Sequence, residues 1–141
     1  MTSSAPIAAN SQRVYVDASA FVKLILDEPE SAAFTAFMTG LAAPAISSEV
    51  LRVEAVRAVR LGTRSSDATR DIETALDELT LASLDDSTLR RAARLDPSTL
   101  RSLDAIHLTT ALNVGADVMV VYDRALAAAA TANGIVPVAP S

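Results

Sequence analysis

The sequence predicts an α/β protein: a three-layer α/β/α sandwich with a mostly parallel central sheet. Short apolar segments of strand length alternate with helical segments along the whole chain, a pattern typical of a parallel sheet covered by helices on both faces. The 141 residues contain no internal repeat and no linker long enough to divide them, so one core is expected. We therefore predict a loose tail over residues 1–12 and a single domain over residues 13–141.

Five short apolar segments are expected to form the strands. The first, "RVYVD", ends in an aspartate, and the fourth, "DVMVVY", is followed by another. Their length and apolar character are those of strands buried on both faces. The predicted strands are residues 13–17, 44–48, 80–84, 117–122 and 135–139.

Two helices are expected between the first two strands. Residues 18–26, "ASAFVKLIL", form a helix that must stop before Pro29, because the residue that precedes a proline is pushed out of the helical region. Pro29 can itself open the next helix, over about residues 29–39, because its fixed φ suits the first helical position. Gly40 then ends that helix.

Caps and breakers delimit the remaining helices. Apolar residues at helical spacing run from about residue 48 to Gly62, and the next helix, within "SSDATRDIETALDEL", begins with Ser65 or Ser66 as its cap. The segment "DSTLRRAARL" forms a helix that Pro97 breaks. Gly115 closes the helix "SLDAIHLTTALNVG", and "RALAAAATANG" forms the last one.

The composition excludes several classes of function. The net charge of −5 argues against a protein that coats nucleic acid through bulk positive charge, and two Tyr, three Phe and no Trp are too few for a base-stacking surface. The lack of cysteine excludes disulfides and thiolate chemistry and suits a cytoplasmic location. No apolar run reaches the length of a membrane span, and the N-terminal segment is a poor signal peptide.

Two aspartates directly follow predicted strands. Asp17 ends the first strand and Asp123 follows the fourth, and each precedes a helix, so each by itself is explained as an N-cap. Two such acids in register, however, meet at the edge where parallel strands end, which is where open α/β sheets bind ligands. Asp117 stands at the start of its strand and therefore belongs to the opposite edge.

Two further acids lie on largely apolar helices. Glu54 shares its helix face with apolar residues four before, four after and seven after it. The ordinary explanation is a pair with Arg57 or Arg60, yet a buried carboxylate is rare without a partner. Asp104 is early in its helix and could simply complement the helix dipole. His107, one turn later, is expected to be a hydrogen-bonded core residue, and as the only histidine it excludes a His-rich zinc site.

Four acids from distant segments are thus expected to converge at one sheet edge: Asp17, Glu54, Asp104 and Asp123. Carboxylates packed together repel one another, and a hard cation such as Mg²⁺ or Mn²⁺, which prefers oxygen ligands, relieves that repulsion. Such a site can activate water and stabilise displacement at phosphorus. Asp85 and Asp86 follow another strand and are reserve candidates, because a cap role for Asp86 explains them, while Glu49 is expected in the first turn of its helix.

Four segments, "VYVDASAFVKL", "SSEVLRVEAVRAVR", "LDAIHLTTAL" and "VYDRALAAAATANGIVPV", occur in this order between residues 13 and 138. Together they resemble the PIN-domain ribonucleases, and most of all the VapC toxins of bacterial toxin–antitoxin pairs. The resemblance implies a PIN-like α/β/α sandwich. It also implies a Mg²⁺- or Mn²⁺-dependent endoribonuclease, the toxin of a type II toxin–antitoxin system, which hydrolyses RNA phosphodiester bonds through a metal-activated water held by an acidic cluster.

The resemblance also implies roles for residues and partners. Ser19 would position a metal-bound water, and Val121 stands where members often carry Thr or Ser, so Asp123 could bind the metal directly or through water. The implied partners are a VapB-type antitoxin, an RNA substrate and a second copy of the chain in a homodimer, with no membrane and no DNA contact by the toxin alone. The residues that match the family's acidic positions, as catalytic residues and metal ligands, are Asp17, Glu54, Asp104 and Asp123.

Other interpretations compete with the nuclease. In a catalytically inert PIN-like module that binds RNA or protein, the acids would only be caps, and acid-dependent metal binding would distinguish the two. A phosphatase with Asp17 as nucleophile is disfavoured, because Ser19 stands where a second Asp is usual and Lys23 is the only lysine.

Two surface features also remain open. The segment "SAAFTAFM", with Phe34 and Phe37, forms either an apolar groove for the antitoxin or ordinary core. Arginines along two helix flanks either follow the RNA backbone or form helix ion pairs. These arginines are Arg57, Arg60, Arg64, Arg90, Arg91 and Arg94.

Overall fold

The computed structural model of the protein describes residues 12–62 and 66–141, in which strands and helices alternate. The strands are β1 (Val14–Val16), β2 (Ile46–Ser48), β3 (Thr80–Ala82), β4 (Val118–Val120) and β5 (Val136–Val138). The helices are α1 (Ala18–Phe21), the 3₁₀ helix η1 (Val22–Leu24), α2 (Ser31–Thr39), α3 (Leu51–Gly62), α4 (Ser66–Asp77), α5 (Asp86–Ala93), α6 (Ser102–Asn113) and α7 (Arg124–Ala132). Each strand lies within a segment that the sequence predicts as a strand.

The five strands form one parallel sheet in the order β3-β2-β1-β4-β5. Tyr15 of β1 pairs with Ile46 of β2 on one side and with Met119 of β4 on the other. From β1 the chain adds β2 and β3 in one direction and later β4 and β5 in the other. The junction of β1 and β4 is therefore a topological switch point, beyond which open α/β sheets bind ligands.

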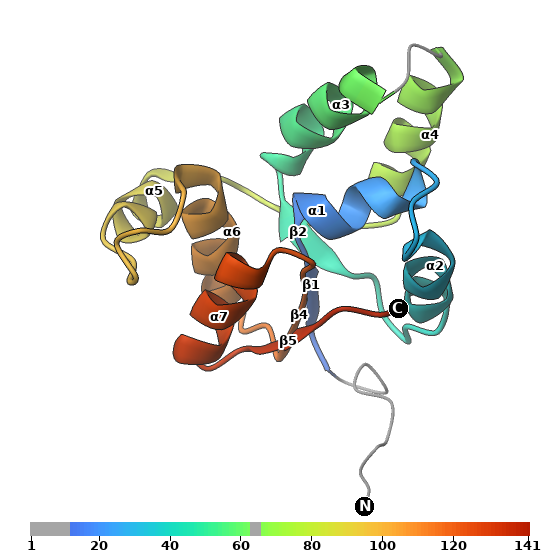
Figure 1. Ribbon diagram of the computed structural model, residues 1–141. Coiled ribbons are helices and arrows are strands. Elements are labelled where there is room, and N and C mark those ends of the chain that lie inside the picture. Colours follow the sequence, from blue (N-terminus) through green and yellow to red (C-terminus); the bar gives the residue numbers. More distant parts are fainter. Residues whose placement is uncertain (1–11, 63–65) are drawn as a thin grey trace, which may run out of the picture.

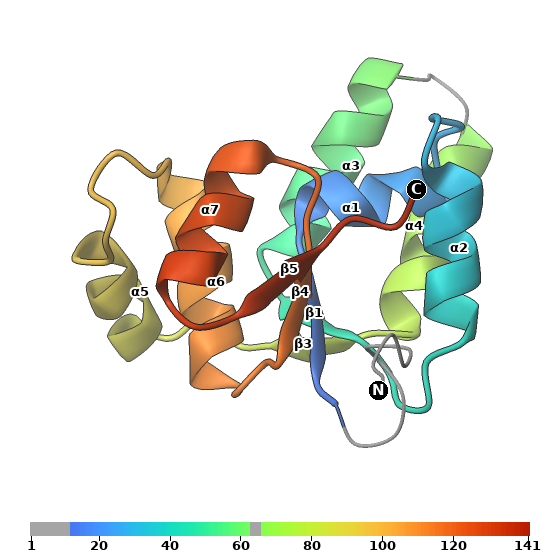
Figure 2. The same cartoon turned by 60° about the horizontal axis from the view of Figure 1, so that its bottom comes forward.

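Helices cover both faces of the sheet. Helices α1, α2, α3 and α4 lie on one side and α5, α6 and α7 on the other in Figure 1, and the rotated view of Figure 2 agrees. The alternation of side chains along a strand divides the core accordingly: Val14 and Val16 pack into one apolar cluster with Phe21, whereas Tyr15 packs into the other with Leu108. The predicted three-layer α/β/α sandwich is confirmed.

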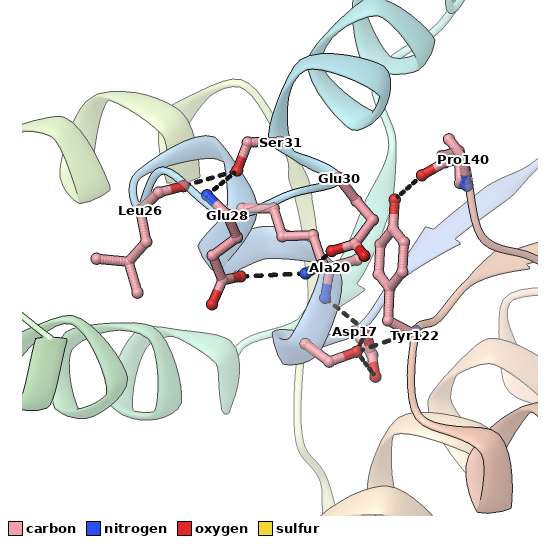
Figure 3. Close-up of polar contacts among 10 residues, drawn as sticks. Asp17, Ala20, Leu26, Glu28, Glu30, Ser31, Tyr122 and Pro140 are labelled. Carbon is pink, nitrogen blue, oxygen red and sulfur yellow. Dashed lines mark hydrogen bonds and ion pairs between the residues drawn. The ribbon is translucent and has the colours of Figure 1, made fainter.

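Two helices near the N-terminus differ from their prediction. The helix expected over residues 18–26 is α-helical only over α1 and then tightens into η1. Helix α2 begins at Ser31 rather than at Pro29. The Ser31 hydroxyl donates to the carbonyl of Leu26 (2.7 Å) and accepts from the backbone N–H of Glu28 (2.9 Å), as Figure 3 shows. These bonds fix a turn before the helix, which the apolar pattern does not reveal.

The start of α3 also differs from its prediction. It begins at Leu51, because Ser48 still belongs to β2. Glu49 therefore precedes the helix, and its Oε1 accepts from the backbone N–H of Leu84 (2.9 Å) instead of complementing the dipole of α3.

The cap of α5 is Asp85 rather than Asp86. Asp85 Oδ1 accepts from the backbone N–H (2.9 Å) and the hydroxyl (2.7 Å) of Thr88. At the other end of the sandwich, Gly115 closes α6 as predicted, with the left-handed φ of +69° that favours glycine.

The segment "SAAFTAFM" belongs to the core. Phe34 is fully buried and meets the ring of Tyr122 edge-on, with centroids 6.4 Å apart, and Phe37 packs against the same cluster. Ordinary packing therefore explains Phe34, whereas an antitoxin groove formed by the more exposed side chains of this segment stays a prediction.

Some predictions fall outside the described residues. Residues 1–11 of the expected tail, Arg64, and the capping hydroxyl of Ser65 or Ser66 cannot be compared with the structure, although α4 does begin at Ser66. In the part of the chain that is described, no helix has the length and apolar character that crossing a membrane requires.

Candidate active site

The four predicted acids meet at the edge of the sheet where the strands end. They line one open cleft of about 490 Å³, together with Ser19 and His107. Asp17 directly follows β1, and Asp123 lies just beyond β4, the neighbouring strand. Glu54 and Asp104 occupy the first turns of α3 and α6. Helix α3 starts at this edge because it follows β2, and α6 starts here because it leads back to the beginning of β4. The predicted convergence is confirmed.

Asp17 is the most buried of the four acids, at 3% exposure. Its Oδ1 accepts from the backbone N–H of Ala20 (3.0 Å), which caps α1 (Figure 3). The Ser19 hydroxyl lies 2.8 and 2.9 Å from the two carboxylate oxygens, to which it donates, and it accepts from the backbone N–H of Tyr122 (3.3 Å). Burial raises the pKa of Asp17 to about 6, even though the hydrogen bonds from Ser19 and from the backbone N–H of Ala20 oppose that rise.

Asp123 is exposed and caps α7. Its Oδ2 accepts from the backbone N–H of Leu126 at 2.8 Å. Val121, two residues earlier, is buried in the apolar cluster that also contains Leu126. Asp17 and Asp123 each cap a helix and also line the cleft. The N-cap that the sequence predicts is confirmed for both residues.

Glu54 pairs with His107, not with an arginine. His107 Nε2 lies 2.5 Å from Glu54 Oε1, and the two side chains are 1% and 16% exposed. Arg57 and Arg60 are exposed on the same helix. His107 Nδ1 lies 2.7 Å from the hydroxyl of Tyr15, so the expectation of a hydrogen-bonded core histidine is confirmed.

Asp104 shows that negative charge accumulates in the cleft. Its partial burial raises its pKa, and the charges of Asp123 and Glu54 raise it further, while the charge of Arg101 lowers it. Two of the other predicted acids therefore lie close enough to influence its ionisation. Repulsion of this kind is what a bound cation relieves.

The donor set fits a hard divalent cation by its chemistry. Four carboxylates and a serine hydroxyl face the cleft, and oxygen ligands of this kind are those that Mg²⁺ and Mn²⁺ prefer. Across residues 12–62 and 66–141, no three His, Cys, Asp or Glu stand arranged to hold an ion. Coordination would therefore require the cleft side chains to move. The hydrogen bonds of Glu54 and Asp123 each engage one carboxylate oxygen, Oε1 and Oδ2 respectively, so each residue retains its other oxygen for a ligand.

Sequence reasoning missed residues at the rim of this cleft. Arg101, Ser102 and Leu103 line it, and Arg101 is exposed directly before α6. The position of Arg101 in the sequence could have indicated its place at the rim, because it lies three residues before Asp104, at the start of the same helix. Among the arginines offered for RNA contact, Arg90 instead pairs with Asp86 on the exposed face of α5 (2.9 Å).

Similarity to known proteins identifies the family. The family profile described as PIN domain matches residues 14–132. This chain belongs to the PIN-domain family. Ribonuclease VapC46 of Mycobacterium tuberculosis is 38% identical over 130 residues, which cover 91% of this chain and 98% of that protein. Ribonuclease VapC47 of the same species is 34% identical over 133 residues, covering 90% and 96% of the two chains.

Two solved structures share the fold of this chain. The crystal structure of M. tuberculosis VapC20, a sarcin-ricin loop cleaving toxin, aligns with a TM-score of 0.74 at 15% identity, over 90% of this chain and 99% of that one. PAE2754 from Pyrobaculum aerophilum aligns with a TM-score of 0.60 at 24% identity, over 93% and 87%. The family profile and the relatives named VapC confirm the VapC-type PIN domain that the sequence motifs indicate, and the two solved structures support its fold.

Proposed function

We propose that this protein is a Mg²⁺- or Mn²⁺-dependent endoribonuclease and the toxin of a type II toxin–antitoxin system. The proposal rests on the cleft at the β1–β4 switch point, where carboxylates from four separate elements meet. Similar proteins that span nearly the whole chain are named ribonucleases, which supports RNA as the substrate.

Each cleft residue has a distinct proposed part. A bound cation would supply positive charge to the phosphate and lower the pKa of a water. Ser19 keeps the Asp17 carboxylate in one orientation and holds its own hydroxyl at the site, where it can position a water. Arg101, exposed at the rim, meets the RNA backbone. The residues that would hold the cation are Asp17, Glu54, Asp104 and Asp123.

The proposed partners follow from the VapC family. We expect a VapB-type antitoxin, an RNA substrate and a homodimer, a cytoplasmic location, and no DNA contact by the toxin alone. Because Phe34 is buried in the core, an antitoxin would have to contact side chains other than Phe34.

One observation favours a second candidate, a catalytically inert PIN-like module that binds RNA or protein. Asp17 and Asp123 are both helix caps, and Glu54 already has a buried partner in His107. In that case the carboxylates would only satisfy backbone and side-chain donors. An inert module is expected to show no acid-dependent Mg²⁺ or Mn²⁺ site.

Cleavage of total cellular RNA by the purified protein tests the proposal. The reaction is run with Mg²⁺ or Mn²⁺ and with a chelator, for the wild type, Asp17→Asn and Asp117→Asn. Asp117 is a matched control because it lies at the opposite edge of the sheet, where its Oδ2 accepts from the backbone N–H of Arg13 (2.8 Å). Cleavage that requires the metal and Asp17 but not Asp117 supports the nuclease.

Other outcomes count against the nuclease proposal. No cleavage by a folded protein that also binds no metal would establish the inert module. Cleavage that survives in Asp17→Asn would show that the active site lies elsewhere or that a contaminant cuts the RNA.

A further inference from the structure

A buried chain of hydrogen bonds leads from the core to the cleft. The Tyr15 hydroxyl lies 2.7 Å from His107 Nδ1, and His107 Nε2 lies 2.5 Å from Glu54 Oε1. Tyr15 is fully buried and His107 is 1% exposed. The chain joins β1, α6 and α3. Its last two members, His107 and Glu54, line the cleft, and Glu54 is the more exposed of the two, with 16% of its side chain accessible.

The chemistry of Glu54 sets the direction of these bonds. A glutamate carboxylate only accepts hydrogen bonds, so His107 Nε2 carries a proton and donates it to Glu54 Oε1. In the neutral imidazole the other ring nitrogen, Nδ1, is then an acceptor. The Tyr15 hydroxyl, 2.7 Å away, donates to it.

We propose that His107 is a positioning residue for the active site: Tyr15 fixes its Nε2–H tautomer, and His107 holds Glu54 Oε1 so that Oε2 faces the cleft for a cation. The cation part of this inference rests on the proposed function, whereas the hydrogen-bond chain does not. A side chain that served only to fill the core would need no polar atom at its cleft-facing end. Groups that orient a metal ligand in this way typically contribute about 10- to 100-fold to metal affinity.

The tautomer can be tested directly, because the chain has one histidine. The ¹⁵N-labelled, metal-free wild type is examined by two-bond ¹H–¹⁵N NMR at neutral pH. We expect one unprotonated ring nitrogen, Nδ1, and one protonated nitrogen, Nε2, with the Nε2 signal moving in Glu54→Gln and the Nδ1 signal in Tyr15→Phe. A proton on Nδ1, or ring-nitrogen signals that do not move in either variant, would overturn this assignment of the tautomer.

Metal affinity tests the positioning role. Binding of Mn²⁺ alone is measured by calorimetry for His107→Gln and His107→Leu, after circular dichroism has shown that each is folded. Gln offers an N–H donor near the position of Nε2 and is expected to stay within about threefold of the wild type, whereas Leu should lose about 10- to 100-fold. Equal affinity of the wild type and His107→Leu would refute the positioning role.

If His107→Leu does not fold, Tyr15→Phe tests the same hydrogen-bond chain. Tyr15→Phe should weaken Mn²⁺ binding severalfold. The matched control is Tyr122→Phe, which removes the chain's other tyrosine hydroxyl, a donor to the carbonyl of Pro140 (2.6 Å) (Figure 3), and should leave Mn²⁺ affinity unchanged. Equal losses in the two variants would contradict the inference. Asp17→Asn separates the hypotheses: if it too binds Mn²⁺ like the wild type, the proposed metal site fails, whatever His107 does.

Discussion

Replacing Asp17 with Asn should stabilise the metal-free protein at neutral pH and abolish its proposed activity. The carboxyl is 3% exposed, and its pKa rises from 3.8 to about 6, chiefly through burial. At about 1.4 kcal/mol for each pKa unit, ionised Asp17 costs the fold about 3 kcal/mol above pH 6. Asn caps a helix about as well as Asp and has no charge to bury.

The pH dependence has a definite sign. Because the folded state holds the proton more tightly than the unfolded chain, Asp17 contributes stability that is fully present below pH 3.8 and is lost as the pH rises through about 6. Asp17→Asn lacks this loss. Its free energy of unfolding should exceed that of the wild type by about 1–3 kcal/mol at pH 7.5, since one Ser19 contact is altered, and the difference should shrink between pH 6 and pH 4.

Urea denaturation with EDTA at several pH values measures this difference, and Asp85→Asn is the matched control. Asp85 also caps a helix by accepting from the N–H three residues on, but its bonds with Thr88 lower its pKa. The same substitution should therefore destabilise the protein slightly at pH 7.5 and leave RNA cleavage intact. Asp17→Asn that is no more stable than the wild type at pH 7.5, or a difference that does not depend on pH, would refute the reasoning.

Further predictions concern the cleft and the core. Glu54→Gln should reduce metal-dependent RNA cleavage by more than about 100-fold, since a lost ligand costs at least as much as a lost supporting group; near-normal rates would exclude it as a ligand. Mn²⁺ at 100 times its dissociation constant should raise the unfolding free energy of the wild type by about 2.7 kcal/mol but not that of Asp17→Asn, as thermal melts can show. Phe34→Ala should cost about 3–5 kcal/mol in urea denaturation, because Phe34 is fully buried; a loss under 1 kcal/mol would show that it is not core. Lys23→Met should lower the urea midpoint, because the ammonium bonds Glu28 and Glu30 (3.1 and 2.8 Å) and lies 4.5 Å from the centre of the Tyr122 ring; an unchanged midpoint would contradict this.

The sequence was sufficient to predict where Asp17 and Asp123 lie. Apolar strand segments reveal a parallel sheet, and parallel strands end at one edge, so acids that follow two strands share that edge whatever the details of packing. Predicting the positions of Asp104 and Glu54 required a further step, because the starts of their helices must also be assigned to this edge of the sheet. The alternation of strands and helices supplies that assignment.

Partners and caps were predicted less well, because they depend on contacts that local patterns do not encode. His107 and Glu54 are 53 residues apart, and their encounter depends on how α3 and α6 approach the sheet. The sequence analysis disfavoured a pair between Glu54 and an arginine of the same helix, as the structure confirms, but it did not name His107 as the partner. Similarly, Pro29 satisfies the rule for a first helical residue, but the hydroxyl of Ser31 bonds the preceding turn and delays the helix.

The cap and the proposed ligand role of Asp17 depend on one another. The N–H of Ala20 and the hydroxyl of Ser19 hold the carboxylate at the end of β1, which restricts the orientations that a flexible acid would otherwise sample. Those bonds do not fully offset its burial, because the pKa of Asp17 remains raised to about 6. At neutral pH Asp17 is therefore a buried, ionised carboxylate whose hydrogen bonds do not fully offset the cost of its burial. Asp104, which lines the same cleft, also has a raised pKa. A purely structural cap gains nothing from such a position, as the lowered pKa of Asp85 shows. A cation in the cleft would balance this charge, and that electrostatic deficit distinguishes Asp17 from Asp85, a helix cap that does not line the cleft.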